Sequence, residues 1–394
     1  MRHLNTFIAQ VVASSVTVIL TVVAARQLAP DDLGVLAIAM AMQALGQGLV
    51  RSFGAEPLLY SHKAYGLGLA QLVSPSSTTA LCGGLALGTV ALGVYSALGQ
   101  PVLGLALAAV FIATFVQDHL RTVLMIQTRG VAVLASDAVG LVTLVGGLLI
   151  AARTPNVSAF LLAWAASALA AASVGAWVVR PKLAASGVPA WLRENRRDGG
   201  LFTLDFAVTS GLNQASVLIV ALIVGTAGAA ALRGAQVLIT PVSLVIRAGG
   251  AALTPIIVRA AAGSQLSRAY KLGAAFSAAC VVAGALCVSW LILPREWVEL
   301  LLGDSAGLAL AVVIPSALAL AATGVAIGAG LCLRATGRLA VATRLKLATA
   351  PLSATGIVVG ALTLGAAGAQ SGIAIGEGVR GALAWRRALQ GRRP

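Results

Sequence analysis

The sequence predicts an all-α polytopic membrane protein with about twelve transmembrane helices, divided six and six between two similar halves. Of its 394 residues, 59% are hydrophobic and only 10% are charged, whereas a soluble domain carries roughly 25% charged residues. Apolar stretches of about 20 residues, the length that spans a bilayer, recur along the whole chain. One basic connection, "RPKLAASGVPAWLRENRRDGG", separates them into two sets.

The apolar stretches give the expected spans in chain order. The first is longer than the roughly 7–15 apolar residues of a secretory signal, so we expect an uncleaved span. The last is short. The expected spans are 4–25, 33–54, 77–98, 102–120, 131–152, 157–179, 202–224, 231–257, 270–293, 306–331, 346–366 and 371–386.

The basic residues predict the orientation of these spans. With the N-terminus inside the cell, most of the 27 Lys and Arg residues fall in cytoplasmic segments, and only Arg26, Arg153, Arg233 and Arg295 lie outside. An excess of Lys and Arg marks cytoplasmic loops. We therefore expect a multi-pass protein of the cytoplasmic (cell) membrane with both termini in the cytoplasm.

The two halves share a repeated feature, an arginine inside an apolar stretch. Arg51 occurs in "QALGQGLVRSFGAEPLLYSHK" and Arg247 in "QVLITPVSLVIRAGGAALTPIIVRA", each followed by small residues and a proline. Internal symmetry of two bundles is typical of transporters whose halves rock about a central site. The expected organisation is an N-terminal bundle (1–180), a basic cytoplasmic linker (181–200) and a C-terminal bundle (201–394).

Polar residues repeat at helical spacing on the first two spans of each half, which predicts four polar faces. They can be interhelical hydrogen-bonding residues, but four faces in symmetric positions, two with an arginine, favour a shared aqueous cavity. The faces are Gln10, Ser14, Thr17 and Thr21; Gln43, Gln47 and Arg51; Asp205, Thr209 and Asn213; and Gln236, Thr240, Ser243 and Arg247.

The other charges within spans have simpler interpretations. Asp118 with Arg121, and Glu377 with Arg380, are spaced i, i+3, so each pair is expected to neutralise itself. Asp137 is expected to start or pack a helix. Arg51 has the alternative of extending to the cytoplasmic surface. Asp205 has no local partner in the sequence and is a candidate site for a coupling H⁺ or Na⁺.

Several function classes lack their sequence signals. The chain has no GxxxxGK[ST] nucleotide-binding loop, and its three histidines follow no metal-binding spacing. The formal charge of +15 comes without basic segments interleaved with aromatics, so a nucleic-acid partner is not expected. The four cysteines lie in apolar segments and are expected to pack between helices. We expect a protein that is not an enzyme and needs no cofactor.

Three segments carry a family resemblance. "ARQLAPDDLGVLAIAMAM" with "VRSFGAEPLL", "FVQDHLRTVLMIQTRGVAVLASDAVG" and "LRGAQVLITPVSLVIRAGGAALTPII" resemble the polysaccharide (O-antigen-like) flippases, of actinobacterial type, in the multidrug/oligosaccharidyl-lipid/polysaccharide exporter superfamily. The resemblance covers most of residues 1–260. It implies two pseudo-symmetric six-helix bundles around a central V-shaped cavity. The chain departs from the family in having no thirteenth or fourteenth span.

The resemblance also implies a function and partners. It implies export of undecaprenyl-pyrophosphate-linked glycans, contact with membrane lipids and association with polysaccharide-assembly proteins; lipid II flippases are similar in carrying cavity arginines on the matching helices. Because arginine binds phosphate oxygens bidentately and stays protonated, Arg51 and Arg247 are expected to clamp one diphosphate. The alternatives are a multidrug extruder of the same fold that exports organic cations by ion antiport, a membrane scaffold, and an intramembrane transferase.

Overall fold

The computed structural model describes residues 2–60, 69–262 and 265–390, and within these ranges it is helical with short connections and contains no strand. Nine helices of this part are long and apolar enough to cross a membrane. The predicted all-α, polytopic fold class is therefore confirmed. The side chains of Gln10, Thr209 and Arg247 lie outside the described residues.

The helices form two compact units, residues 1–28 with 39–214, and residues 29–38 with 215–394. Unit 1 takes its helices from the first half of the chain. For this part the sequence predicted an N-terminal bundle over residues 1–180 and a linker over residues 181–200. Helix α2 contributes to both units, because its first residues, up to Ile38, belong to unit 2. There Asp31 Oδ1 accepts a hydrogen bond from Thr226 Oγ1 (2.6 Å).

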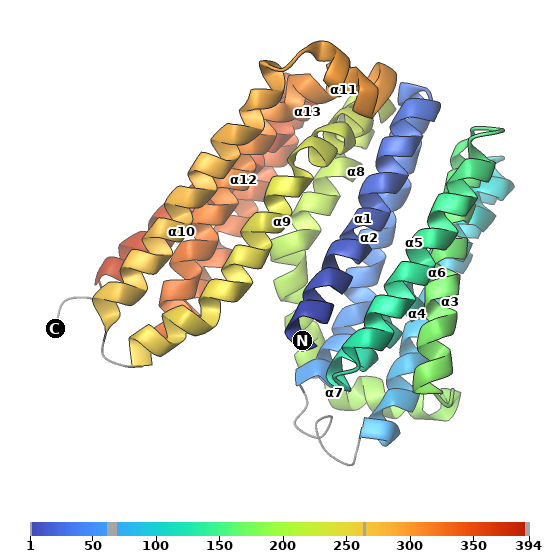
Figure 1. Ribbon diagram of the computed structural model, residues 1–394, viewed down its shortest axis with the longest axis horizontal. Coiled ribbons are helices and arrows are strands. Elements are labelled where there is room, and N and C mark those ends of the chain that lie inside the picture. The colour runs from blue at the N-terminus through green and yellow to red at the C-terminus, as the bar shows by residue number, and fades with distance from the viewer. Residues whose placement is uncertain (1, 61–68, 263–264, 391–394) are drawn as a thin grey trace. The chain divides into compact units, whose positions relative to one another are not determined.

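Unit 1 is built around α4. This helix packs on α3 and α6, and α5 packs on α6 and α1 (Figure 1). The helices of this unit are α1 (Arg2–Gln27), α2 (Pro30–Tyr60), α3 (Leu69–Ala97), α4 (Pro101–Ile126), α5 (Gly130–Ala151), α6 (Val157–Val179) and α7 (Val188–Phe206), with a 3₁₀ turn (Ala185–Gly187) before α7 and a π-helical turn (Ala207–Gly211) after it.

Local sequence sets where these helices begin and how closely they approach. Pro101 opens α4, where its missing N–H and fixed φ are suited to the first turn. Asn156 caps α6 by accepting a hydrogen bond from the backbone N–H of Ala159 (2.9 Å). Gly84 on α3 faces the backbone of Ile112 on α4, where an added Cβ would lie 2.9 Å from Cα. The absence of a side chain at this glycine thus lets α3 and α4 pack closely.

Unit 2 packs α9, α10, α12 and α13 side by side (Figure 1). Its helices are α8 (Leu212–Val224), α9 (Thr226–Ala262), α10 (Leu266–Cys287), α11 (Arg295–Leu302), α12 (Ala306–Ala335) and α13 (Leu339–Gln390), with 3₁₀ turns at Val288–Leu291 and Gly303–Ser305. Helix α13 is two helices joined at a kink, where Gly365 has φ 61°. The twelfth span was expected to be short, at 371–386; the helix after the kink instead continues to Gln390, because polar residues at its end do not stop helix formation.

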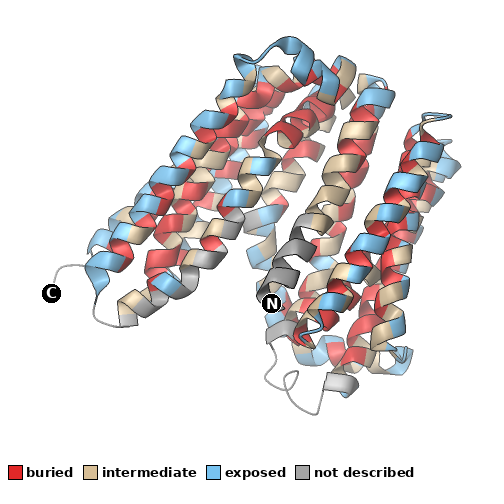
Figure 2. Ribbon diagram, in the orientation of Figure 1, coloured by how far each residue is buried: buried red, intermediate tan, exposed pale blue. Residues whose placement is uncertain are grey.

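Large apolar side chains stay exposed on the outer faces of the helices, as a lipid environment requires. Val90 on α3, Val142 on α5 and Leu286 on α10 are each more than half exposed. Exposed positions recur along α5 and α10 in Figure 2, opposite buried ones. An exposed apolar face on helices of this length identifies a multi-pass membrane protein.

Candidate functional site

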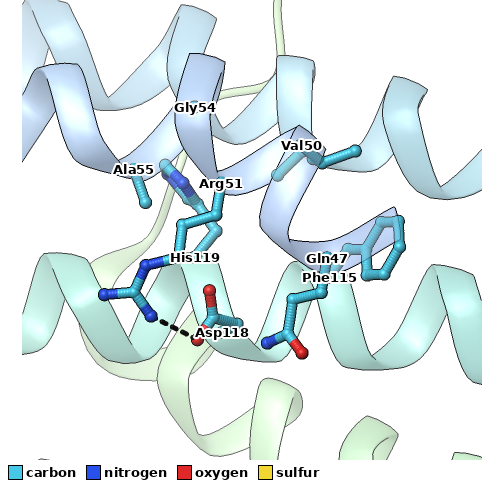
Figure 3. Close-up of a pocket in the computed structure, with 9 residues that line it drawn as sticks. Gln47, Val50, Arg51, Gly54, Ala55, Phe115, Asp118 and His119 are labelled. Atoms are coloured by element: carbon cyan, nitrogen blue, oxygen red, sulfur yellow. Dashed lines mark hydrogen bonds and ion pairs between the residues drawn. The ribbon is translucent and has the colours of Figure 1, made fainter. Parts of the chain in front are cut away.

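Arg51 is held by two carboxylates inside unit 1. Its Nε donates to Glu56 Oε1 on the same helix (2.7 Å), and its Nη1 donates to Asp118 Oδ1 on α4 (3.1 Å). Figure 3 shows Arg51 and Asp118 extending toward one another from α2 and α4. The Arg51 side chain is 34% exposed and that of Asp118 is 16% exposed. The guanidinium is thus fixed in direction and still accessible.

The Arg51–Asp118 contact lies in a small pocket between α2, α3 and α4 (Figure 3). The charged groups share it with an amide, an imidazole and a phenyl ring, so one wall is polar and the other apolar. The lining residues are Gln47, Val50, Arg51, Gly54, Ala55, Ala80, Phe115, Asp118 and His119.

His119 is a polar residue of this pocket that sequence reasoning did not assign. The residue is only 2% exposed, its Nε2 lies 3.3 Å from Ser76 Oγ, and its Nδ1 is buried with no hydrogen-bond partner among the described residues. Its signal in the sequence was the adjacent pair Asp118-His119 within an apolar span. An unsatisfied ring nitrogen beside a pocket is able to bond to a solute or a water there.

Gln43 and Gln47 occupy different positions although they share one face of α2. Gln43 is buried, and its Nε2 donates to Gln47 Oε1 (2.8 Å) and to Thr114 Oγ1 on α4 (3.0 Å). Gln47 lines the pocket. Gln43 therefore joins two helices and orients Gln47, as the interhelical interpretation of these residues predicted.

The expected pairing of Asp118 with Arg121 is wrong. Asp118 bonds to Arg51, whereas Arg121 Nε bonds to both carboxylate oxygens of Asp137 on α5 (3.0 and 3.2 Å). Asp137 was expected to start or pack a helix, and instead its side chain is fully buried in an ion pair. Both side chains bond to partners on neighbouring helices, and the i, i+3 spacing along one helix does not reveal such partners. The other expected pair, Glu377 with Arg380, is confirmed.

Helix α7 supports the end of α2 that carries Arg51. Trp191 is buried, and its Nε1 donates to the carbonyl oxygen of Phe53 (2.7 Å). An added Cβ at Gly199 would lie 2.5 Å from the Phe53 ring, and one at Gly48 would lie 2.0 Å from the Phe206 ring. The basic segment that was expected to be a linker is thus largely a helix packed along α2.

The predicted polar face of the first span is buried at its Thr21 end. Thr21 is fully buried and donates to the carbonyl oxygen of Thr17 (2.7 Å), and Thr17 donates to that of Ser14 (3.1 Å). Each hydroxyl thus bonds within its own helix, and that of Thr21 also lies 3.9 Å from the sulfur of Met40 on α2. Ser14 itself is half-buried, and the expectation for the Gln10 side chain falls outside the described residues.

Asp205 and Asn213 flank the π-helical turn between α7 and α8. Asp205 is exposed and Asn213 half-buried. Both take part in a side-chain or backbone interaction, so the expectation that Asp205 has no partner is wrong.

In unit 2 the predicted face of α9 has one further member. Arg233, expected in an external loop, lies two turns inside α9, and its Nη1 donates to Gln236 Oε1 (3.0 Å). Thr240 donates to the carbonyl oxygen of Gln236 (2.6 Å), and Ser243 donates to that of Thr240 (2.8 Å). The expectation for the Arg247 side chain falls outside the described residues. Its relation to Arg51, in the other unit, is therefore untested.

The charge of the Arg51 site limits its chemistry. Two carboxylates contact one guanidinium here, so an entering anion has to replace a carboxylate contact of Arg51, and a cation can bind to the carboxylates. Among the described residues, no group of three His, Cys, Asp or Glu side chains is placed to hold a metal ion.

No protein-family model matches the chain, and no curated protein matches it in sequence. Solved structures do match in fold. An inward-facing multidrug resistance MATE family transporter of the MOP superfamily aligns with a TM-score of 0.71 at 13% identity, covering 95% of this chain and 94% of that one. The lipid II flippase MurJ in an inward closed conformation gives 0.71 at 13% identity, with coverage of 98% and 87%.

A third match is the MOP superfamily transporter from Pyrococcus furiosus Vc1 (DSM3638), described by a reversed polarity of its binding pocket; it gives 0.59 at 14% identity, covering 99% and 95%. The chain has the fold of the MOP superfamily transporters. This agrees with the fold that the sequence resemblance implied, and the matches include a multidrug resistance transporter and a lipid II flippase.

Proposed function

We propose that this protein is a flippase that moves a lipid-linked (undecaprenyl-pyrophosphate) oligosaccharide or polysaccharide precursor across the cytoplasmic membrane by alternating access. The observation that carries the proposal is the partly exposed Arg51 side chain, which lies in a pocket on a largely apolar span. The shared fold with the lipid II flippase MurJ supports it. An arginine placed in a membrane interior is costly to keep and indicates a functional path.

The two carboxylates explain how such a cation is kept without substrate. A guanidinium in a low-dielectric site needs a counter-charge, which Glu56 and Asp118 supply. A diphosphate headgroup offers more charge and a geometry that matches the planar guanidinium. In the proposed cycle the headgroup replaces carboxylate contacts when it binds, and the carboxylates replace the headgroup when it leaves.

The remaining site residues have proposed supporting roles. Arg247 would provide the second cation of a clamp, with one arginine from each half. Gln47 would bind the headgroup beside Arg51, with Gln43 orienting it. Polar contacts to the glycan are proposed for Gln10, Ser14, Asn213, Gln236, Thr240 and Ser243. Asp205 remains the proposed position for a coupling H⁺ or Na⁺, and polysaccharide-assembly proteins are proposed partners.

A second candidate function is export of organic cations by ion antiport. The net negative charge of the Arg51, Glu56 and Asp118 group favours it, because a negatively charged pocket attracts cations and protons. The shared fold with a multidrug resistance transporter supports it equally well. The charge of the transported molecule distinguishes the two candidates.

The test compares two substrates in one set of proteoliposomes. A fluorescent undecaprenyl-pyrophosphate sugar in the outer leaflet is scored by its protection from a membrane-impermeant quencher, and ethidium is scored by uptake driven by a pH gradient. We expect movement of the pyrophosphate lipid, with the rate lowered about 10-fold or more by Arg51→Ala and partly recovered by Arg51→Lys. Ethidium transport without lipid movement would instead establish the second candidate.

A further inference from the structure

A row of polar residues runs along α9 with an arginine at each end. Arg233, Gln236, Thr240, Ser243 and Arg247 follow one another at alternating steps of three and four residues, which keeps them on one face. Arg233, Gln236, Thr240 and Ser243 are half-buried. Their neighbours Leu232 and Leu238 are buried. The row is therefore a half-buried polar face, whereas the exposed residues Pro241 and Val245 lie on another face of this helix.

The opposite side of α9 is occupied by packing. An added Cβ at Gly234 would lie 2.8 Å from Cβ of Ala309 on α12. The polar row is thus directed away from this interface, since residues one and two positions from Gly234 lie on other faces.

The Arg233–Gln236 contact fixes the orientation of the amide. Arg233 is a donor only, so the atom that accepts its hydrogen bond must be Gln236 Oε1, at 3.0 Å. Nε2 then lies on the other side of the amide. It is buried with no hydrogen-bond partner among the described residues. A native structure rarely leaves a buried donor unsatisfied, and such a donor calls for an explanation by a bound group or water.

Both groups point to the same ligand chemistry. A guanidinium and an amide NH₂ are donors, and α9 contains no Asp or Glu that would compete for them along its own length. We propose that Arg233 and Gln236 form a second binding station for an anionic oxygen, either of the lipid diphosphate or of a sugar carboxylate on the glycan. This inference rests on the proposed function and extends it.

The position on α9 gives the station its place in transport. Arg233 and Arg247 are fourteen residues apart, or ~21 Å along the helix, which is too far for one diphosphate to contact both. The start of α9 is predicted to lie on the non-cytoplasmic side. A headgroup that moves outward would therefore meet the Arg233–Gln236 station late, on the release side.

The decisive variant is Gln236→Glu. It keeps an acceptor for Arg233, so the contact becomes an ion pair and the fold is preserved, but it replaces the unpartnered donor Nε2 with an anionic oxygen. A station for anions predicts loss of binding by about 10-fold or more with an unchanged melting temperature. A purely structural contact predicts unchanged binding.

The experiment measures binding isotherms of purified full-length protein with two probes, farnesyl diphosphate and methyl glucuronide. The variants are Gln236→Glu, Arg233→Gln, Arg233→Lys and Arg51→Ala, and the matched control is Arg295→Gln, whose exposed side chain pairs with Glu299. We expect weaker binding in Gln236→Glu and Arg233→Gln, partial recovery in Arg233→Lys, and no change in Arg295→Gln.

The two probes distinguish the source of the anion. Loss with farnesyl diphosphate assigns the station to the lipid headgroup, and loss with methyl glucuronide assigns it to a sugar carboxylate. Unchanged binding of both probes in Gln236→Glu and Arg233→Gln would overturn the inference. Weaker binding in Arg51→Ala alone would support the proposed function and contradict the station on α9. Weaker binding in the α9 variants alone would support the station and contradict the role proposed for Arg51.

Discussion

Two regions of this protein keep an arginine in an apolar surrounding, and they do so by different means. On α2, Arg51 bonds to the carboxylates of Glu56 and Asp118, and nearby Arg121 bonds to the carboxylate of Asp137. On α9, Arg233 bonds to the neutral amide of Gln236. In the first region the cations pair with carboxylates, and in the second Arg233 contacts a neutral amide.

This difference has a chemical consequence. A cation with carboxylate partners is stable when no substrate is bound to the site, and an incoming anion must displace those partners. A cation oriented by an amide has no such competitor on its own helix, and the amide adds a second donor. The α2 region is therefore suited to exchange between states, and the α9 region to direct binding of an anion.

The buried ion pair of the first region gives the largest expected effect. Asp137→Ala removes the partner of Arg121, whose side chain is only 12% exposed, and leaves an uncompensated charge. We expect the protein to lose about 3–5 kcal/mol of stability, seen as a lower melting temperature in detergent. Glu299→Ala is the control, because the exposed Arg295–Glu299 pair is worth at most ~1 kcal/mol. Equal effects would show that carboxylates are not required near α2.

The comparison also predicts opposite signs for two substitutions that change charge by one. Asp118→Asn removes a competitor for Arg51 and should tighten binding of farnesyl diphosphate by about 10-fold, consistent with ~1–4 kcal/mol for two charges 4 Å apart. Gln236→Glu adds a competitor on α9 and should weaken it by a similar factor. Isothermal titration of both variants checks this. Weaker binding in Asp118→Asn would mean that the carboxylate itself helps to hold the ligand.

The smallest expected effect concerns the support of α2 by α7. Trp191→Phe keeps an aromatic ring but removes the hydrogen bond to the Phe53 carbonyl, at an expected cost of about 1 kcal/mol. Melting temperature and farnesyl diphosphate affinity should both fall slightly, because α2 carries Arg51. Trp177→Phe on α6, where the side chain is exposed, is the matched control. An equal fall in both variants would show that the hydrogen bond from α7 does not support α2.

Hydropathy predicted most of the fold. Runs of apolar residues located the spans, whereas the cap that Asn156 forms at the start of α6 was not predicted. The predicted ends of the short twelfth span were wrong. Hydropathy detects the apolar centre of a helix but not its polar continuation, which here reaches Gln390.

The site was harder to predict than the fold. Arg51 and Gln47 were singled out by spacing along one helix, and the pocket contains both. The partners of Arg51 were not predicted. Asp118 on α4 faces Arg51 on α2, and a single sequence does not specify how two helices are rotated toward one another. Arg233 was assigned to a loop, since a basic residue near a span boundary has the same local signal whether it is outside the helix or two turns inside it.

The most direct test of the account is binding of a lipid-pyrophosphate glycan to purified wild type, Arg51→Ala, Arg247→Ala and the double variant, with melting temperatures measured alongside. If both arginines bind one diphosphate, each single variant should bind ~10- to 150-fold more weakly. The double variant should lose less than the sum of the two, because a headgroup released by one arginine no longer gains from the other. Strictly additive losses, or losses that follow the melting temperature alone, would contradict the proposed clamp.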